Sequence, residues 1–463
     1  MNRNDLKLIL GFAIFQLYVF LSLGFLKVFF VDDGVDDSGI ILYWGSSIAN
    51  ILSLLICAAL HDKLAKAIDS KTALVVAGLL CAFGTPLLSL APASHAAFMI
   101  LLVLSSIFTG VGTALFYFQL ASRFITSDEK RAVSNVFYAY CLSFLLSSIF
   151  GFVNGVFAVV FTSLLPCIIV ILLLDEPSGG LSVSAEKSMT EESKKELTPL
   201  LVKLCISVLV FSFCSGIMKS VFLRTPTMWN IRVAILIAGV TLAVMALVAI
   251  LHSTGKSIDA VIIYRCVFFV AIVCITLLIL DGEHADDARA IHRVSGELFR
   301  CLLFIFCLRL CQRTHFLPLA VFGLLLSLSK IGSFAMGRLG ASILETYGAT
   351  TQGLLLIVML AALYLFIFSE EDVRNLMETS HVVTSLKKAN KERCEALAKK
   401  TGLTTREAEV LELYSQGKTL AVIAETMHLS ESTVNMHRRK IYTKLGIHSK
   451  QELLELLEHE EQD

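Results

Sequence analysis

Long apolar runs fill most of the chain between residues 7 and 368, and they restrict its fold more than any other feature. Each run approaches or exceeds the roughly 18 residues that an α-helix needs to cross a bilayer. Only 17% of the 463 residues are charged, whereas soluble domains carry about a quarter charged residues. We therefore predict an all-α chain with a twelve-span membrane domain at 1–369, its spans at 7–30, 39–60, 72–91, 96–122, 132–153, 155–174, 200–223, 231–251, 258–280, 294–312, 316–344 and 351–368.

A polar segment at 175–199, rich in Ser, Glu, Lys and Gly, separates six spans at 6–174 from six at 200–368. Two six-helix halves joined in this way resemble the major facilitator superfamily of transporters, whose halves pack face to face around a central cavity. That family has a loop motif between its second and third spans. Here Lys66 stands where the motif has Asp, and Asp69 stands where it has Gly. This departure counts against transport gating more than against the fold.

Basic residues in the connections predict the orientation, because cytoplasmic loops contain an excess of Lys and Arg. With the N-terminus inside, the cytoplasmic side of the first half has Arg3, Lys7, Lys63, Lys66, Lys71, Arg123, Lys130, Arg131, Lys187, Lys194 and Lys195. The opposite connections of that half contain almost none. An even number of spans then places both termini in the cytoplasm. The first run lacks a cleavage site of the A-x-A type, so we expect it to remain as a span.

The twelve cysteines do not predict a disulfide framework, because eleven lie in apolar runs and only Cys394 lies in a polar segment, where the cytoplasm keeps thiols reduced. We interpret them as small packing residues. The alternative is a metal or redox role for Cys307 and Cys311, one helical turn apart. No His or carboxylate near them in the sequence completes a ligand set. We therefore expect no metal and no cofactor.

Polar side chains inside the spans provide candidates for a ligand cavity. Arg300 and Arg309 lie nine residues apart in one short span, which places them on roughly opposite faces, so at most one of them faces the cavity. A cavity-facing Arg favours an anionic ligand such as a carboxylate, and the alternative is anchoring at the membrane interface. The other candidates, for each of which a hydrogen bond to another helix is the simpler interpretation, are Gln16, Asn50, Gln119, Asn135 and Tyr138.

Acidic residues are scarce in the apolar runs. No Asp or Glu lies well inside one, since Glu297 and Glu345 are near run ends. Carriers coupled to protons or ions tend to use intramembrane carboxylates or histidines. The pattern therefore counts against ion-coupled transport.

The charged segment 370–400 contains no Pro or Gly and predicts a helical linker. Leu376, Val383, Asn390 and Leu397 recur every seven residues. This stripe indicates a short coiled coil between two copies, in which one Asn selects a dimer. A single solvated helix is the alternative, and the pattern does not decide between them.

The C-terminal residues carry the most specific pattern. Thr404 and Glu407 predict a capping box at the start of a helix. Ser430 is expected to cap a third helix, which ends at Gly446. From 438 to 444 this third helix has four basic residues and no acidic one, in a domain where acidic residues outnumber basic ones. The local basic surface predicts contact with DNA.

Residues 403–454 resemble the LuxR-type, or GerE-like, helix-turn-helix of bacterial regulators, through L-T-T-R-E-A-E-V-L at 403–411, I-A-E at 423–425, L-S-E-S-T-V-N-M-H at 429–437 and K-L-G at 444–446. The resemblance implies a four-helix DNA-binding domain at 401–463. It implies base contacts by Asn435, Met436 and Arg439, and phosphate contacts by Thr433, His437, Lys440 and Lys444, with Arg438 on the same basic surface. It further implies dimerisation through the last helix, at Leu453, Leu454 and Leu457.

Together these features resemble membrane-bound LuxR-type regulators with transporter-like spans. We expect a transcriptional regulator in the bacterial cytoplasmic membrane that binds double-stranded operator DNA as a homodimer and responds to an unknown small molecule. The lack of a receiver domain makes the membrane domain the natural input. Two alternatives are a working transporter with a fused DNA-binding domain, and spans that only anchor that domain. No acid/base or nucleophilic constellation in the soluble part indicates an enzyme.

Overall fold

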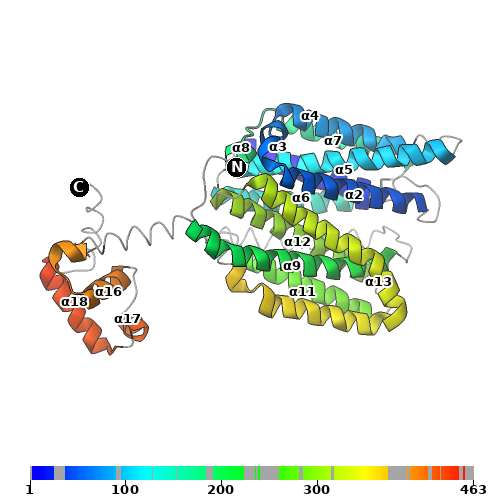
Figure 1. The fold of residues 1–463 in the computed structure, drawn as a ribbon. Coiled ribbons are helices and arrows are strands. Elements are labelled where there is room, and N and C mark those ends of the chain that lie inside the picture. Colours follow the sequence, from blue (N-terminus) through cyan, green and yellow to red (C-terminus); the bar gives the residue numbers. More distant parts are fainter. Residues whose placement is uncertain are drawn as a thin grey trace. The chain divides into compact units, whose positions relative to one another are not determined.

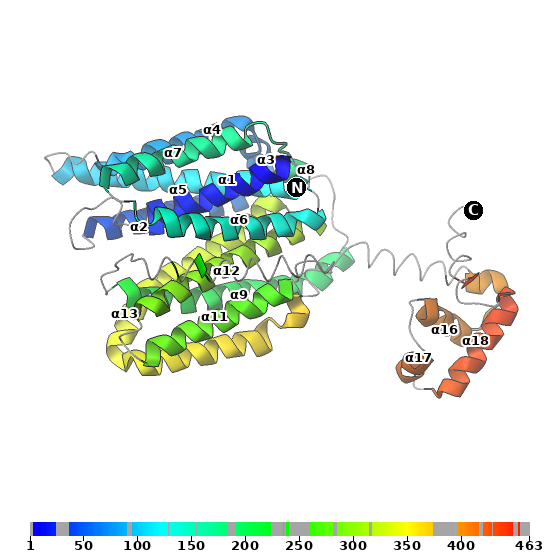
Figure 2. The same ribbon diagram turned by 180° about the vertical axis from the view of Figure 1, so that it is seen from behind.

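The computed structural model describes residues 3–24, 37–89, 95–127, 129–153, 155–183, 191–223, 260–280, 285–313, 317–373, 397–415, 420–427 and 429–447, with the single positions 235, 238, 239, 394, 452 and 453. The regular elements of these described residues are all helices. This confirms the all-α prediction. The chain divides into two compact units, Met1–Met377 and Glu378–Asp463, whose helices are drawn from two sides in Figures 1 and 2.

The first unit, which we call the membrane unit, is a helical bundle in two halves (Figure 1). The first half contains α1 (Arg3–Val19), η1 (Phe20–Gly24), α2 (Asp37–Ala59), α3 (His61–Ile68), α4 (Lys71–Gly84), η3 (Pro86–Ser89), α5 (His95–Thr126), α6 (Glu129–Phe150), α7 (Gly155–Leu173) and α8 (Gly180–Val183). The described part of the second half contains α9 (Glu191–Leu223), α11 (Ala260–Leu280), α12 (Ala285–Arg313), α13 (Pro318–Ala362) and η6 (Leu363–Ile367).

Within the described residues, six helices are long and apolar enough to cross a bilayer, or seven if the bent pair α2 and α3 forms one span. The predicted run at 231–251 lies outside the described residues except for three single positions. The number of twelve spans therefore stays a prediction. A polytopic helical membrane bundle is nevertheless what the described helices form.

Two helix boundaries have clear local causes. α6 and α7 are separate helices because Gly155 has a φ of +62°, a left-handed conformation that favours glycine. This break supports 155–174 as a span of its own. α2 ends at Ala59, and α3 turns away from it by 111°. Ser70 then caps α4 by accepting a hydrogen bond from the backbone N–H of Ala73 at 3.1 Å.

The second half differs from the sequence prediction in how its helices are divided. The predicted runs 316–344 and 351–368 are not separated: α13 continues from one into the other up to Ala362, η6 follows it, and the ribbon of α13 turns back at the far end of the bundle (Figure 1). α12 begins at Ala285, well before the predicted run at 294–312. Its polar first turns were not recognised as helix because they lack an apolar run.

Small and polar residues bring α2 and α5 close together. A Cβ on Gly110 would lie 2.6 Å from the carbonyl oxygen of Ser46, so this position has no room for a side chain. Asn50 donates hydrogen bonds to the carbonyl of Gly110 at 3.0 Å and to the hydroxyl of Thr113 at 2.8 Å. Without water in the bilayer, such contacts and close backbone approach are what hold helices together.

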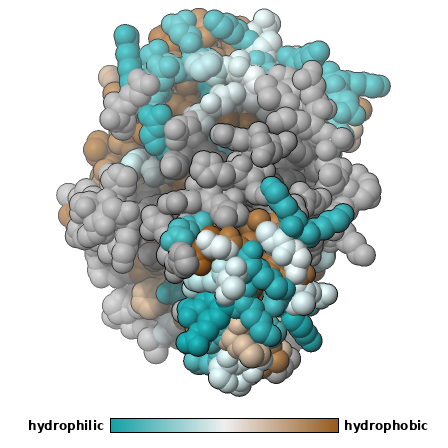
Figure 3. Space-filling view, turned by 90° about the vertical axis from the view of Figure 1, so that its left-hand side faces the viewer, coloured by the Kyte–Doolittle hydropathy of each residue, from teal (hydrophilic) through white to brown (hydrophobic). Residues whose placement is uncertain are grey.

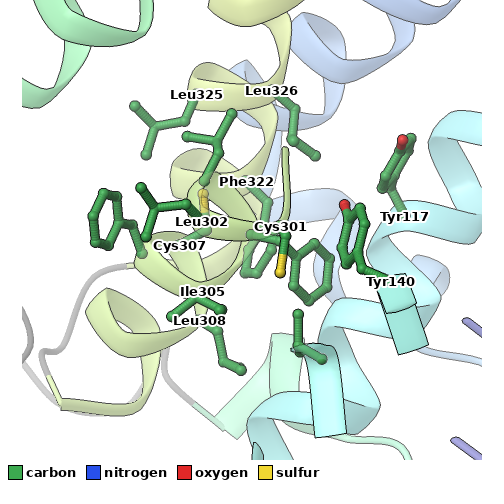
Figure 4. Close-up of a cluster of buried hydrophobic side chains, with 14 of the residues drawn as sticks. Tyr117, Tyr140, Cys301, Leu302, Ile305, Cys307, Leu308, Phe322, Leu325 and Leu326 are labelled. Atoms are coloured by element: carbon green, nitrogen blue, oxygen red, sulfur yellow. The ribbon is translucent and has the colours of Figure 1, made fainter. Parts of the chain in front are cut away.

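Aromatic side chains join the two halves at the centre of the bundle. Phe304 of α12 lies 4.7 Å from Phe12 of α1 and 5.8 Å from Phe124 of α5, measured between ring centroids. All three rings are fully buried. Figure 4 shows the neighbouring part of this core, where Tyr117 and Tyr140 face the packed side chains of Cys301, Leu302 and Phe322. The halves therefore share one apolar core.

The C-terminal unit contains α16 (Thr405–Ser415), α17 (Leu420–Met427) and α18 (Glu431–Leu445). Its core consists of buried residues from all three helices together with Cys394, Leu397, Ile447 and Leu453. Cys394 and Leu397, predicted to lie in the linker 370–400, thus pack inside this unit. The heptad residues Leu376, Val383 and Asn390 lie outside the described residues.

Candidate nucleic-acid interface and intramembrane polar cluster

Local capping interactions fix the two helices that present the candidate DNA-binding residues. The backbone N–H of Thr404 donates to Oε2 of Glu407 at 2.9 Å, and the N–H of Glu407 donates to the Thr404 hydroxyl at 3.4 Å. This is the predicted capping box. The hydroxyl of Ser430 accepts from the N–H of Thr433 at 3.2 Å, and Gly446 ends α18 with a φ of +65°. Both predicted boundaries of the third helix are confirmed.

The packing of α18 leaves one face of the helix for a ligand. Val434 and Ile441 point into the core. The opposite face presents Arg439 and Lys440, which are exposed, and Met436, 47% of whose surface is accessible. This helix therefore offers two cations beside an apolar side chain. Such a set suits phosphates, base edges and thymine methyl groups.

Four of the predicted contact residues are only partly accessible: Thr433, Asn435, His437 and Arg438. The guanidinium of Arg438 lies 5.9 Å from the ring centroid of Tyr442, a cation–π distance. Burial raises the pKa of the Tyr442 hydroxyl to about 12. Oδ1 of Asn435 and Nδ1 of His437 are buried and have no hydrogen-bond partner among the described residues. These two atoms, on the helix that carries Met436, therefore still need a hydrogen-bond partner.

Lys444, one helical turn after Lys440, is already paired within its own domain. Its Nζ lies 2.7 Å from Oε2 of Glu407 and donates to the carbonyl of Gly402 at 3.0 Å. The hydrogen bond from Lys444, with that from the Thr404 N–H, lowers the pKa of the Glu407 carboxyl to about 2. The lysine thus ties the end of α18 to the start of α16. A contact with phosphate has to compete with this ion pair.

The predicted dimerisation stripe needs one correction. Leu453 is fully buried in the core of its own unit, so its side chain is not available to a second copy. Sequence periodicity shows that a face is apolar but not whether the chain itself covers it. Leu454 and Leu457 lie outside the described residues.

In the membrane unit, a polar cluster from both halves gathers at the middle of the spans. Nε2 of Gln16 on α1 donates to the hydroxyl of Tyr140 on α6 at 3.1 Å. Tyr117 on α5 is also buried against α1, with its ring 4.8 Å from that of Phe15, measured between centroids. On the other side, Nε of Arg300 on α12 donates to Glu297 at 2.9 Å, and the Arg300 charge acts on both tyrosines. We call this set, with Lys330, the central polar cluster.

Lys330 of α13 contributes the second cation, with Nζ 5.8 Å from the centroid of the Tyr117 ring. Two cations and one carboxylate give the cluster a formal charge of +1. The Arg300 side chain is 39% accessible although it lies in the middle of α12. The cluster can therefore hydrogen-bond a polar molecule and favours a negative charge.

The remaining predicted cavity residues do not converge on this cluster. Asn50 bonds α5 as described above, and Tyr138 packs against the apolar core. Gln119 donates to the carbonyl of Ser70 at 3.0 Å and accepts from Arg123 at 2.6 Å. Asn135 donates to Asp5 at 3.2 Å. Arg309 is partly buried on α12. For the three amides the simpler interpretation, a bond between helices, applies.

Sequence reasoning placed four members of the cluster outside the site. Tyr117 and Tyr140 stand in aromatic runs, for which lipid-facing or packing roles are the simpler interpretation and an aromatic ligand site is the alternative. Glu297 is at the end of its apolar run but near the middle of α12, because this helix begins at Ala285. Lys330 is a basic residue inside an apolar run. A charged residue within a span was the signal that could have found it.

Asp69, which departs from the transporter loop motif, anchors the segment that follows α7. Its carboxylate accepts from the N–H groups of Gly179 and Leu181, at 3.1 and 3.2 Å, and from the hydroxyl of Ser122. Nearby, Lys7 pairs with Glu176 at 3.0 Å. Figure 3 views the protein from the left-hand side of Figure 1, and hydrophilic residues gather there over parts of the described surface. The sequence departure therefore has a structural role.

Two small cavities lie inside the second half, one lined by Cys214, His292 and Ser295 and the other by Tyr264, Phe299 and Phe368. Each has a volume of about 20 Å³. This is room for about one water molecule. Within the described residues, no group of three His, Cys, Asp or Glu side chains is arranged to hold a metal ion.

Residues 401–457 match the sequence profile described as "Bacterial regulatory proteins, luxR family". These residues form a LuxR-family domain. A curated relative, the "Uncharacterized response regulatory protein YgeK" of Escherichia coli (strain K12), is 48% identical over 52 residues. That match covers 11% of this chain and 35% of the length of the relative. The similarity is thus confined to the C-terminal domain.

The membrane unit resembles solved transporters in fold. A POT family transporter in complex with 5-aminolevulinic acid superposes with a TM-score of 0.54 and 10% identity, covering 79% of this chain and 96% of the transporter. The human organic anion transporter MFSD10 (TETRAN) superposes with a TM-score of 0.53 and 13% identity, covering 78% of this chain and 99% of the transporter. The chain therefore combines a transporter-like helical bundle with a LuxR-type domain.

Proposed function

We propose that this chain is a membrane-bound transcriptional regulator whose transporter-like unit senses a small molecule and controls operator binding by the LuxR-type domain. The observation that carries the proposal is the presence of both parts in one chain, with Met436, Arg439 and Lys440 accessible on the third helix of the domain. The bundle lies in the cytoplasmic membrane with both termini in the cytoplasm, where DNA is. No catalytic chemistry is required.

On DNA, Asn435, Met436 and Arg439 contact base edges, and Thr433, His437 and Lys440 contact phosphates. Arg439 is accessible and carries a planar fork that matches guanine, whereas Met436 offers an apolar contact for thymine. Lys444 supports the fold of the domain through Glu407. A single domain of this size makes a small interface, so two copies bind a pseudo-palindromic site.

The small molecule binds at the central polar cluster. A ligand between Gln16 and Tyr140 of the first half and Arg300 of the second touches both halves, so its affinity depends on how they are arranged. Differential affinity for two arrangements is what shifts a population. The net positive charge of the cluster favours a carboxylate. 5-Aminolevulinic acid, which one structural neighbour binds, is a suitable first probe.

Transcript profiling of a deletion strain tests the regulatory part. Transcripts altered by the deletion return to their original level when the wild-type chain is supplied, and not when the Arg439→Ala chain is supplied. Equal restoration by both chains would show that DNA contact through α18 is not involved. Equivalent expression of the two chains in the membrane fraction is the control.

The second candidate is a working transporter with a fused regulatory domain, which the fold of the neighbours favours. Purified chain in proteoliposomes separates the candidates. Uptake of a labelled carboxylate against its gradient supports transport, and saturable binding without accumulation supports a sensor. A chimera in which an unrelated membrane anchor replaces the bundle separates the third possibility. If the bundle is the sensor, the chimera no longer responds to the small molecule; if the spans only anchor the DNA-binding domain, the response is kept.

A further inference from the structure

Residues 368–373, which we call the exit segment, are the last described part of the membrane unit. Phe368 and Val373 are fully buried there. The hydroxyl of Tyr264 on α11 donates to the carbonyl of Phe368, and the Phe368 ring lies 5.8 Å from that of Phe306 on α12. The exit segment is therefore packed into the bundle at both of its ends.

In addition to this packing, two ion pairs fix the orientation of the exit segment on the bundle. Nε and Nη2 of Arg265 on α11 donate to the two carboxylate oxygens of Glu370, at 2.6 and 2.5 Å. Such a two-point contact sets the orientation of the carboxylate as well as its distance. Lys203 on α9 lies 2.9 Å from Asp372. The carboxylates are the less exposed partners, at 25% and 14%.

The same residues start a helix. The N–H of Ser369 donates to Asp372 at 2.8 Å, and the N–H of Asp372 donates to the Ser369 hydroxyl at 3.3 Å. This is a capping box, with Asp where Glu is usual. Asp372 thus bonds the first turn of this helix and Lys203 together. The direction in which the helix begins is set by α9 and α11.

The contacts named above, and the one that the Tyr364 hydroxyl makes with Glu370, tie the exit segment to described residues of the second half, in α9, α11, α12 and η6. The halves meet each other elsewhere. For example, Nε2 of Gln312 at the end of α12 donates to the carbonyl of Phe124 on α5 at 3.1 Å. A change at that contact moves the second half against the first without breaking the exit segment.

We infer that the exit segment makes the start of the linker a rigid extension of the second half, so that rotation of this half against the first is the signal delivered to the DNA-binding domain. That the start of the linker is rigidly joined to the second half follows from the contacts above alone. The consequence for transcription rests on the proposed function. The two are therefore tested separately.

The mechanical test uses the full chain in lipid nanodiscs, with spin labels on ketone-bearing residues at positions 371 and 355, both exposed. The wild type gives one narrow distance distribution. Arg265→Glu places like charges together and broadens it at least twofold, and the exchanged pair Arg265→Glu with Glu370→Arg narrows it again. Lys63→Glu, a charge reversal on the first half, is the matched control. A distribution that stays narrow in Arg265→Glu overturns the inference.

The functional test needs no ligand. Gln312→Ala removes a hydrogen bond between the halves, which shifts their equilibrium by about fivefold, and regulated transcripts change accordingly. In the Arg265→Glu chain, Gln312→Ala does not change the regulated transcripts. In the chain with the exchanged pair Arg265→Glu and Glu370→Arg, Gln312→Ala changes them again. An equal response in both chains, or none in either, overturns the relay. Operator occupancy of the wild-type chain is measured in parallel, and its absence counts against the proposed function instead.

Discussion

The ammonium of Lys444 lies 2.7 Å from Oε2 of Glu407, a carboxylate with only 3% of its surface accessible. This pair joins the end of the third helix of the DNA-binding domain to the capping box of the first. The sequence resemblance assigns Lys444 to phosphate contact. In the folded domain its nearest anion is part of the domain itself.

Removing Lys444 therefore destabilises the domain. Lys444→Ala leaves a buried carboxylate with fewer donors, and we expect a loss of about 1–3 kcal/mol in its free energy of unfolding. Pulse proteolysis of the C-terminal domain within the full chain in detergent measures this loss. Lys440→Ala, at an exposed position of the same helix, should leave stability unchanged and weaken DNA binding. Equal stability of the two variants would contradict the structural role of Lys444.

Acid should weaken this same interaction. The pKa of Glu407 in the folded domain is about 2, below the 4.5 that is usual for a glutamate. A depressed carboxyl pKa contributes stability that is present above pH 4.5 and is lost as the pH falls toward 2. Glu407→Gln removes this contribution, so its unfolding free energy should fall less between pH 5 and about 2.5 than that of the wild type. Parallel pH profiles of the two chains would show that the pair is not linked to folding.

Arg439→Ala should weaken binding to the operator by about 1–3 kcal/mol and relax the preference at one base pair. Arg439 is exposed, and among the described residues its guanidinium has no hydrogen bond or ion pair, so stability should not change. Arg406→Ala is the matched control, because Arg406 is exposed on α16 and pairs with Glu409. Mobility-shift titration with the full chain measures both. Similar affinities for the two variants would contradict the assignment of α18.

At the central polar cluster, Tyr140→Phe removes the acceptor of the Gln16 amide and nothing else. We expect the affinity for a carboxylate ligand to fall by about fivefold, as one hydrogen bond is worth about 1 kcal/mol. Calorimetric titration of the purified chain with 5-aminolevulinic acid measures the change. Tyr138→Phe, on the same helix but packed against the core, is the control. Loss of affinity only in the control would place the site elsewhere.

The DNA-binding domain could be predicted from the sequence because its signals are local. The box of Thr404 and Glu407 and the caps Ser430 and Gly446 depend on residues three or four positions apart, or on one φ angle. Lys444 depends on a residue 37 positions away. No helical periodicity reports that contact. The role of Leu453 was missed for the same reason.

In the membrane unit, too, local features could be predicted from the sequence and long-range contacts could not. Apolar runs predicted most helices, but polar residues within them differ only in the helix that they face. Gln16 meets Tyr140 across 124 residues, whereas Gln119 meets the carbonyl of Ser70 across 49. Both are amides in apolar surroundings, and the sequence does not distinguish them. Residues 370–373 of the exit segment were assigned to the linker because they are charged, although Lys203 and Arg265 bind those charges to the bundle.

The central claim is that the chain binds specific DNA sites while it remains in the membrane. Chromatin immunoprecipitation from the membrane fraction, with a tag at the C-terminus and cross-linking in living cells, tests it most directly. We predict a small set of enriched sites that contain inverted half-sites, recovered with the full-length chain and lost in Arg439→Ala. Recovery of the sites only with a cleaved soluble fragment, or equal recovery with Arg439→Ala, would contradict the account.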